Sequence, residues 1–212
     1  MSLATFDTLL GGRKIIAVLR GRDSSQYEGV IETLIDSGVN GIELTMTTPG
    51  TLDALPALQK RFADDACIGV GTVVKEEAAR KAIDMGAEYL VAPNLKSDVV
   101  SVAVDAAVPM LPGVLTPSEV QQALDLGVQT VKIFPAQTVG AGYLKHLRGP
   151  FPELQAIPSG GVDLDTARAW LSAGAPAVSV GGPLLGDVFS TGDLAGLGRT
   201  ASAFVRKLET DS

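Results

Sequence analysis

The chain has 212 residues, 46% of them hydrophobic and 5% aromatic, and a formal net charge of −7 at pH 7. These values predict one folded domain over residues 1–212 and argue against nucleic acid or an anionic membrane as a partner. A single Cys and a single His exclude a disulfide framework and a cysteine- or histidine-rich metal site. Neither a signal-peptide pattern nor a membrane-spanning apolar stretch is present, so we expect a cytoplasmic protein.

Eight short apolar runs recur along the chain, roughly every 20 to 26 residues, each followed by a turn and an amphipathic segment. They are Ile15–Leu19, Gly41–Thr45, Cys67–Gly71, Tyr89–Ala92, Pro109–Leu111, Val128–Ile133, Leu154–Ile157 and Ala177–Val180. This spacing predicts parallel strands joined by crossover helices, and therefore an α/β protein, a (β/α)8 TIM barrel with an N-terminal helix. An open doubly wound sheet is the alternative, but the G-x-G-x-x-G fingerprint does not follow the first strand.

The segments between these runs carry ordinary helix-end signals. Thr48 before Pro49 predicts a helix N-cap with proline at the first helical position. Thr116 and Glu119 have the spacing of a capping box, and Asp163 precedes another helical segment. Glycines at four predicted helix C-termini are expected to adopt the left-handed conformation: Gly38, Gly86, Gly127 and Gly174.

Lys132 lies within the apolar run Val128–Ile133, whereas the other lysines lie on polar segments. Lysine is rarely buried without a reason, and burial disfavours its charged form. A neutral amine in this place can attack a ketone and form a Schiff base. The alternative is a structural lysine that reaches the mouth of the barrel or pairs with Glu43.

Alternation along Gly41–Thr45 places Glu43 on the opposite face from Ile42 and Leu44, inside the barrel. A carboxylate there is either a general base, acting directly or through water, or a charge partner that holds Lys132 or Arg20. Arg20 ends the first strand and suits a substrate carboxylate, although it could also be an ordinary loop arginine.

Two glycine pairs follow the seventh and eighth predicted strands, at Gly160-Gly161 and Gly181-Gly182. Glycine lets backbone N–H groups approach an anion closely, and these loops form the usual phosphate site of TIM barrels. One such pair alone would carry little information, but two in these places favour a phosphorylated substrate.

Seven motifs, in this order, resemble those of the class I aldolases that act on 2-keto-3-deoxy-6-phosphogluconate (KDPG) or 4-hydroxy-2-oxoglutarate (KHG). They are Ile42–Thr45, Gly69–Val73, Ala92–Asn94, Leu111–Val114, Val131–Ala136, Pro158–Val162 and Val180–Gly182. The resemblance implies a homotrimeric barrel with no metal or organic cofactor. It also implies that Lys132 forms the Schiff base, that Glu43 is the acid–base residue, and that Thr72, Pro93 and Phe134 line the pyruvyl pocket.

The sequence departs from many members of that family at two positions. Thr47 stands where an arginine commonly binds the substrate carboxylate, and Arg20 resembles the alternative arginine of other branches, including the phosphogalactonate aldolases. Pro183 replaces a serine after the second glycine pair. Ser159 offers a hydroxyl where phosphogluconate enzymes have threonine and a phosphogalactonate enzyme has an apolar residue, which favours the gluconate epimer.

The resulting hypothesis is a lyase that splits KDPG into pyruvate and glyceraldehyde 3-phosphate, and that also accepts KHG, giving pyruvate and glyoxylate. One alternative is the phosphogalactonate epimer as substrate. Others are a barrel isomerase or decarboxylase without a Schiff base, and a phosphosugar-binding barrel without catalysis.

Overall fold

The computed structural model describes residues 6–209. In chain order, its elements are α1 (Phe6–Leu10), β1 (Ile15–Leu19), η1 (Ser24–Gln26), α2 (Tyr27–Asp36), β2 (Gly41–Thr45), α3 (Thr51–Phe62), β3 (Cys67–Gly71), α4 (Glu76–Asp84), β4 (Leu90–Val91), α5 (Ser97–Asp105), β5 (Met110–Leu111), β6 (Gly113–Val114), α6 (Pro117–Asp125), β7 (Thr130–Ile133), η2 (Ala136–Thr138), α7 (Gly142–Leu147), β8 (Gln155–Pro158), α8 (Leu164–Ser172), β9 (Val178–Val180), α9 (Gly182–Leu185), α10 (Val188–Thr191) and α11 (Leu194–Glu209).

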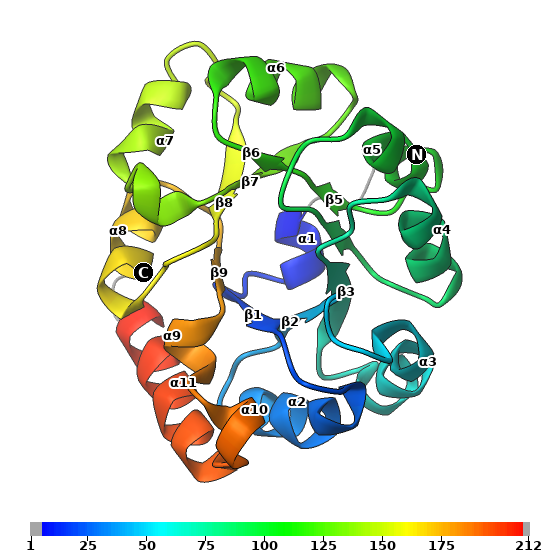
Figure 1. The fold of residues 1–212 in the computed structure, drawn as a ribbon. Helices are drawn as coiled ribbons and strands as arrows, with labels where there is room; N and C mark the ends of the chain where they lie inside the picture. Colours follow the sequence, from blue (N-terminus) through cyan, green and yellow to red (C-terminus); the bar gives the residue numbers. More distant parts are fainter. Residues whose placement is uncertain (1–5, 210–212) are drawn as a thin grey trace.

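The strands form two hydrogen-bonded parallel sheets, with the orders β5-β4-β3-β2-β1-β9 and β6-β7-β8. Figure 1 looks along the strands, which surround a centre that holds α1, while the longer helices lie outside them. The sheets adjoin at two places. β5 and β6 are separated only by Pro112, and an isolated bridge pairs Ser159 with Ser179.

The predicted strands agree closely with these elements, and β1, β2 and β3 match residue for residue. The fifth predicted strand, Pro109–Leu111, is the short β5, and β6 follows after Pro112. Proline has no N–H to donate to a ladder, so it interrupts regular pairing. The Pro112 carbonyl still accepts a hydrogen bond from the Lys132 N–H at 2.9 Å, which joins the interrupted strand to β7.

The helix-end signals are confirmed with one exception. Thr116 and Glu119 form the capping box, and the four C-terminal glycines have φ between 86° and 94°. The prediction that Thr48 caps α3 is wrong, because the helix begins at Thr51 after Gly50 in the left-handed conformation. The Thr48 hydroxyl instead accepts a hydrogen bond from the Gly21 N–H, so a tertiary contact replaces the local cap.

Apolar side chains form two clusters. The larger one includes Ile15, Ala17 and Leu19 of β1 and buried residues of the surrounding helices. The second, which we call the inner core, holds two side chains of α1 and the side chains from the opposite face of the strands. Its members are Phe6, Leu10, Ile16, Cys67, Tyr89, Val91, Leu111, Ile157 and Ala177. Because α1 contributes Phe6 and Leu10, this helix lies in the centre between the two sheets, near the strands' amino ends (Figure 1).

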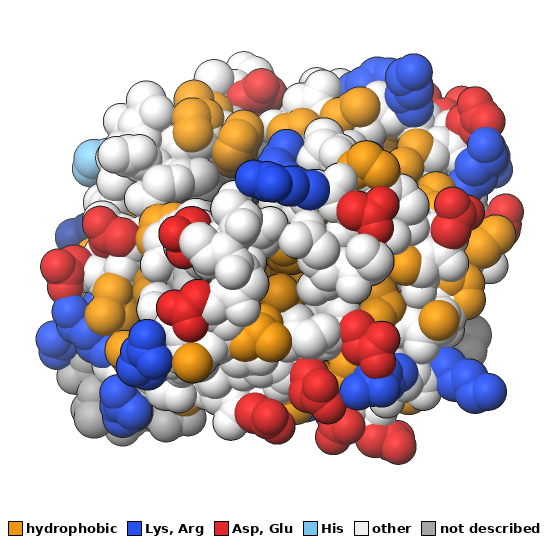
Figure 2. Space-filling model, turned by 60° about the horizontal axis from the view of Figure 1, so that its bottom comes forward, with side chains coloured by type: hydrophobic (Ala, Val, Ile, Leu, Met, Phe, Trp, Pro, Cys, Tyr) orange, Lys and Arg blue, Asp and Glu red, His pale blue; other side chains and the backbone are white. Residues whose placement is uncertain are grey.

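The exterior is charged and mixed. On the face that Figure 2 shows, acidic and basic side chains are interspersed rather than separated into blocks. No helix within residues 6–209 is both long and apolar enough to cross a membrane.

Candidate active site

A pocket of about 450 Å³ opens at the carboxyl ends of the strands. Every site residue predicted from the sequence lines it: Arg20, Glu43, Thr72, Pro93, Lys132, Phe134, Ser159, Gly160, Gly161, Gly181 and Gly182. These residues come from seven strands or the turns that follow them. The parallel arrangement therefore brings together polar groups that are far apart in the sequence.

Lys132 is the third residue of β7, between Gly113 of β6 and Ile157 of β8. Its side chain is only 6% exposed, and Nζ lies 5.2 Å from the centre of the Phe134 ring. Within the described part of the chain, Nζ makes no ion pair closer than 4.0 Å. A primary amine is thus held at the wall of a pocket, over an aromatic face rather than against a carboxylate.

Glu43 is 1% exposed, although it carries a carboxylate. Its backbone pairs with Val18 and Gly69, and its side chain fills the space above Gly71, where a Cβ would collide with it. Oε2 is buried and has no hydrogen-bond partner among the described residues. A buried oxygen without a partner is costly in a folded protein, so this atom is poised to interact with a ligand or a water molecule.

Thr72 follows β3 with a φ of 63°, in the left-handed region. A β-branched residue is strained there, at a cost on the order of 1–3 kcal/mol. The Val73 N–H donates to the Val91 carbonyl at 3.0 Å, which secures the turn. Strain of this kind concentrates at functional sites, and Thr72 lines the pocket as the sequence predicts.

The first glycine pair forms a turn with left-handed backbone at both residues, φ 87° at Gly160 and 73° at Gly161. A Cβ at Gly160 would lie 2.9 Å from the Phe134 ring, and one at Gly161 would overlap Gln137. Within residues 6–209, neither N–H donates a hydrogen bond. Both are therefore free to bind an anion in the pocket.

Ser159 is 4% exposed, and its hydroxyl lies 3.3 Å from that of Ser179 on β9. Arg20, at the end of β1, is exposed toward the same pocket. Across the described residues, its guanidinium forms no ion pair. Arg20 therefore supplies a positive charge that is available to a ligand.

One wall of the pocket was not expected from the sequence. It consists of residues that follow the second glycine pair: Pro183, Leu185, Gly186, Asp187, Phe189 and Ser190. Pro183 was identified only as a departure, and the others carry no motif. The remaining lining residue that was missed is Val18, which ordinary strand alternation could have assigned to the interior.

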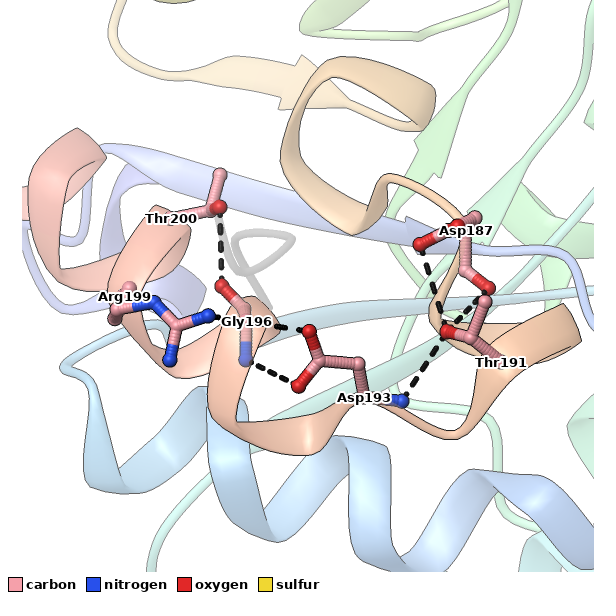
Figure 3. A network of polar contacts seen from close by, with 6 residues as sticks. All are labelled: Asp187, Thr191, Asp193, Gly196, Arg199 and Thr200. Atoms are coloured by element: carbon pink, nitrogen blue, oxygen red, sulfur yellow. Dashed lines mark hydrogen bonds and ion pairs between the residues drawn. The ribbon is translucent and has the colours of Figure 1, made fainter.

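A polar network joins this wall to α11 (Figure 3). The Thr191 hydroxyl donates to the Asp187 carbonyl at 3.2 Å and accepts from the Asp193 N–H at 3.2 Å. Asp193 in turn accepts from the Gly196 N–H at 2.8 Å and lies 3.9 Å from Arg199. These contacts anchor α10 and the residue before it to the start of the long final helix.

The single His and the single Cys of the chain lie away from the pocket. His146 is exposed on α7, and Cys67 belongs to the inner core, where burial raises the pKa of its thiol. No group of three or more His, Cys, Asp or Glu side chains suited to a metal ion occurs in the described part of the chain.

The chain resembles known proteins in both sequence and fold. The model for KDPG and KHG aldolases matches residues 6–199. The chain is 32% identical to the 2-dehydro-3-deoxy-6-phosphogalactonate aldolase of Escherichia coli, over 80% of this chain and 83% of the relative. It is also 32% identical to the 2-dehydro-3-deoxy-phosphogluconate aldolase of Haemophilus influenzae, over 75% of each.

A solved structure of the 2-keto-3-deoxy-6-phosphogluconate aldolase of Zymomonas mobilis with 3-phosphoglycerate superposes with a TM-score of 0.82 at 28% identity. The match covers 96% of this chain and 97% of the other. This chain therefore shares its α/β fold with parallel strands with that relative, over nearly the whole length of both chains.

Proposed function

The chain belongs to the KDPG and KHG aldolase family, an enzyme family of the lyase class, and from this premise we propose that it reversibly cleaves KDPG to pyruvate and glyceraldehyde 3-phosphate. The observation that carries the proposal is the presence of two nearly inaccessible groups, Lys132 and Glu43, in the lining of one pocket. KHG, which gives pyruvate and glyoxylate, is a further substrate of the same chemistry.

In the first step, the Lys132 amine attacks the C2 ketone of the substrate. Loss of water from the carbinolamine gives a protonated imine, which accepts the electron pair released later. The position of Nζ at the pocket wall, without an ion pair to another described residue, supports this role. The Phe134 face, 5.2 Å from Nζ, stabilises the positive charge that the imine carries.

Glu43 then takes the proton of the C4 hydroxyl, directly or through water. The C3–C4 bond breaks and its electrons move into the imine. Glyceraldehyde 3-phosphate departs, and an enamine of pyruvate remains on Lys132. Protonation at C3 and addition of water release pyruvate and restore the amine. The unpartnered Oε2 of Glu43 supports its assignment as the group that holds the transferred proton.

Arg20 is proposed to bind the substrate carboxylate, because a guanidinium can donate two parallel hydrogen bonds to it. It lines the pocket, whereas Thr47, at the position where many relatives carry arginine, is exposed and donates its hydroxyl to Thr45 at 3.2 Å. Thr72, Pro93 and Phe134 enclose the three-carbon pyruvyl part, and Ser159 is placed to bond the C4 hydroxyl.

The phosphate is proposed to bind at Gly160-Gly161 and Gly181-Gly182. The free N–H groups of the first pair support this assignment. The Zymomonas relative was solved with 3-phosphoglycerate, a three-carbon phosphate like the aldehyde product, which supports a phosphorylated substrate. Pro183 provides neither an N–H nor a hydroxyl. We therefore assign the contacts on that side to backbone groups of the two glycines.

A second candidate substrate is the phosphogalactonate epimer. It is favoured by the presence of Arg20, rather than an arginine at position 47, and by the phosphogalactonate aldolase from Escherichia coli among the relatives. The two epimers differ only at C4, the carbon whose hydroxyl Ser159 is proposed to bond. Values of kcat/KM for KDPG, its galactonate epimer and KHG distinguish the three possibilities.

We also propose that the two sheets form one closed barrel of eight strand–helix units. β5 and β6 count as one strand, because its first half bonds to β4 and its second half to β7. The Ser159–Ser179 bridge supports closure on the other side. A single barrel domain, a homotrimer and a cytoplasmic location remain predictions.

The proposal is tested by borohydride reduction in the presence of pyruvate, followed by peptide mass spectrometry. We expect a reduced pyruvate adduct on Lys132 in the unaltered protein and none in Lys132→Met, which also loses aldol cleavage. Lys145→Met on the exposed side of α7 is the matched control and retains both. An unmodified Lys132, or full cleavage by Lys132→Met, contradicts the mechanism.

A further inference from the structure

A cluster of buried hydroxyl groups lies behind the turn that carries Arg20. It consists of Tyr27, Thr45, Thr48 and Thr51, each no more than 3% exposed. None of these four lines the pocket, and the chemistry proposed above does not use them. Buried hydroxyl groups need hydrogen-bond partners, so the partners of this cluster reveal what it holds.

Two of its hydroxyls bind the backbone on either side of Arg20. The Thr45 hydroxyl donates to the Leu19 carbonyl at 3.0 Å, and the Gly21 N–H donates to the Thr48 hydroxyl at 3.0 Å. The peptide groups that precede and follow Arg20 are thereby tied to the end of β2 and the turn beyond it.

The proton count fixes the direction of these bonds. Each hydroxyl has one proton, and Thr45 donates its own to Leu19. Across the 3.3 Å between the Thr45 and Thr48 oxygens, Thr48 is therefore the donor. Thr48 accepts from the Gly21 N–H and donates to Thr45, so it links the Arg20 turn to the rest of the cluster.

Further hydrogen bonds fix the hydroxyl groups of the cluster to the backbone and to one another. The Thr51 hydroxyl lies 2.9 Å from the carbonyls of Thr45 and Thr48, and the Tyr27 hydroxyl lies 2.9 Å from that of Thr51. Burial raises the pKa of Tyr27, and hydrogen bonding with the Thr48, Thr51 and Thr45 hydroxyls opposes this rise. Tyr27 therefore stays protonated at neutral pH and serves as a donor.

The opposite side of the Arg20 turn is also occupied. A Cβ at Gly21 would lie 3.0 Å from the Phe189 ring, and the Gln26 amide donates to the Phe189 carbonyl at 2.9 Å. The turn is thus enclosed between the hydroxyl cluster and α10. Its backbone has little freedom, while the guanidinium has no ion pair with another described residue.

We propose that Thr48 is a positioning residue for the substrate carboxylate and acts through Arg20. The inference rests on the proposed function, in which Arg20 binds that carboxylate. A long side chain binds with less loss of entropy when its root is fixed, and a small displacement of a binding group weakens recognition strongly. Thr48 fixes the backbone next to Arg20 by accepting the hydrogen bond from the Gly21 N–H.

The test uses pyruvate as the probe and isothermal calorimetry as the measurement. Thr48→Val removes the hydroxyl at nearly constant volume, and we expect it to weaken pyruvate binding about tenfold. Thr48→Ser keeps the hydroxyl and is expected to restore binding to within about twofold. Thr33→Val is the matched control, because it removes a hydroxyl bonded to a backbone carbonyl at 2.8 Å within α2, away from the pocket.

A double-mutant cycle separates positioning from general destabilisation. If Thr48 acts through Arg20, the loss caused by Thr48→Val disappears when it is made in Arg20→Ala. An equal loss in both backgrounds overturns the proposal, and so does unchanged pyruvate binding in Thr48→Val.

Amide exchange at Gly21 provides a readout that does not depend on aldol chemistry. Thr48→Val is expected to accelerate exchange of this N–H, and Thr33→Val to leave it unchanged. Equal protection in both variants and the unaltered protein overturns the proposal that Thr48 holds the Gly21 N–H. Failure of the proposed function appears separately, as absence of the borohydride adduct on Lys132 in the unaltered protein.

Discussion

Glycine on one strand makes room for a carboxylate on the next. The Glu43 side chain occupies the space that a side chain at position 71 would fill, and this contact directs the carboxylate into the pocket. Alternation in Gly41–Thr45 was sufficient to predict that Glu43 faces inward. The packing over Gly71 could not be predicted, because it depends on which residue of β3 lies beside β2.

Replacement of Glu43 by glutamine preserves size but removes the proton acceptor. We expect kcat for KDPG cleavage to fall by about 10²- to 10⁴-fold, the range typical of a lost general base. The pyruvate adduct on Lys132 is still expected after long incubation, because the amine is intact. Steady-state kinetics and borohydride trapping measure the two effects.

Glu76→Gln is the corresponding control, since Glu76 pairs with Arg80 on exposed α4. Its kcat is expected to match that of the unaltered protein. Cleavage by Glu43→Gln at the unaltered rate would remove Glu43 from the mechanism and leave it a structural carboxylate.

Thr48 illustrates a limit of sequence interpretation at the same scale. The pair Thr48-Pro49 has the form of a helix start, yet α3 begins two residues later and the hydroxyl binds Gly21. A local pattern cannot reveal a partner 27 residues away. The role that we infer for Thr48 therefore required the folded structure.

Among the helices, the ends were the most predictable feature. The Thr116–Glu119 capping box and the four left-handed glycines depend on residues within one turn of each other, so short-range chemistry determines them. The same holds at the start of α8, where Asp163 accepts from the Thr166 N–H at 2.9 Å.

This cap gives a pH-dependent prediction. The hydrogen bonds from the Thr166 N–H and hydroxyl lower the pKa of Asp163. The charged carboxylate therefore stabilises the folded state above the unfolded pKa of about 3.9, and this contribution is lost as the pH falls through the lower folded value. Asp163→Ala is expected to reduce the free energy of unfolding by about 1 kcal/mol at pH 7.

Urea unfolding of Asp163→Asn provides the control. Asparagine keeps an accepting oxygen but does not titrate, so its deficit relative to the unaltered protein is expected to shrink between pH 5 and pH 3. A deficit that stays constant over this range would show that the charge of Asp163 contributes nothing.

For the whole molecule, the central observation is the separation of two apolar cores. The inner core includes the Phe6 and Tyr89 rings, whose centres are 5.4 Å apart, and the Tyr89 hydroxyl donates to the Ile42 carbonyl at 2.6 Å. Leu10 of α1 lies against Gly41, the first residue of β2. This places α1 at the amino ends of the strands, opposite the pocket.

Phe6→Ala tests whether the packing of α1 and the activity of the pocket are independent of each other. Removing a buried ring is expected to cost about 3 kcal/mol of folding free energy and to lower Tm by roughly 6–12 °C. The value of kcat for KDPG is expected to stay unchanged, because Phe6 is not among the residues that line the pocket. Thermal unfolding and steady-state kinetics measure these two quantities.

Leu194→Ala is a suitable control, because Leu194 is 39% exposed and its loss is expected to change stability by no more than about 0.5 kcal/mol. A fall in kcat that parallels the loss of stability in Phe6→Ala would contradict the independence of the two ends.

At this scale the sequence supported the repeating strand–helix order, because each short apolar run is a local signal. It did not predict that Pro112 divides one strand between two sheets, nor that the segment from Leu185 to Ser190 forms a pocket wall. The wall depends on how α9 and α10 pack against α11, and those contacts join residues without any recognisable motif.

The placement of α1 opposite the pocket has a consequence for laboratory evolution of this fold. Randomising the turns that surround Lys132 leaves Phe6, Leu10 and Tyr89 untouched, so a library of such variants begins with its folding free energy largely preserved. Variants that accept new aldehydes can then be selected by changing the turns around the pocket, without first introducing compensating substitutions in α1 and the inner core.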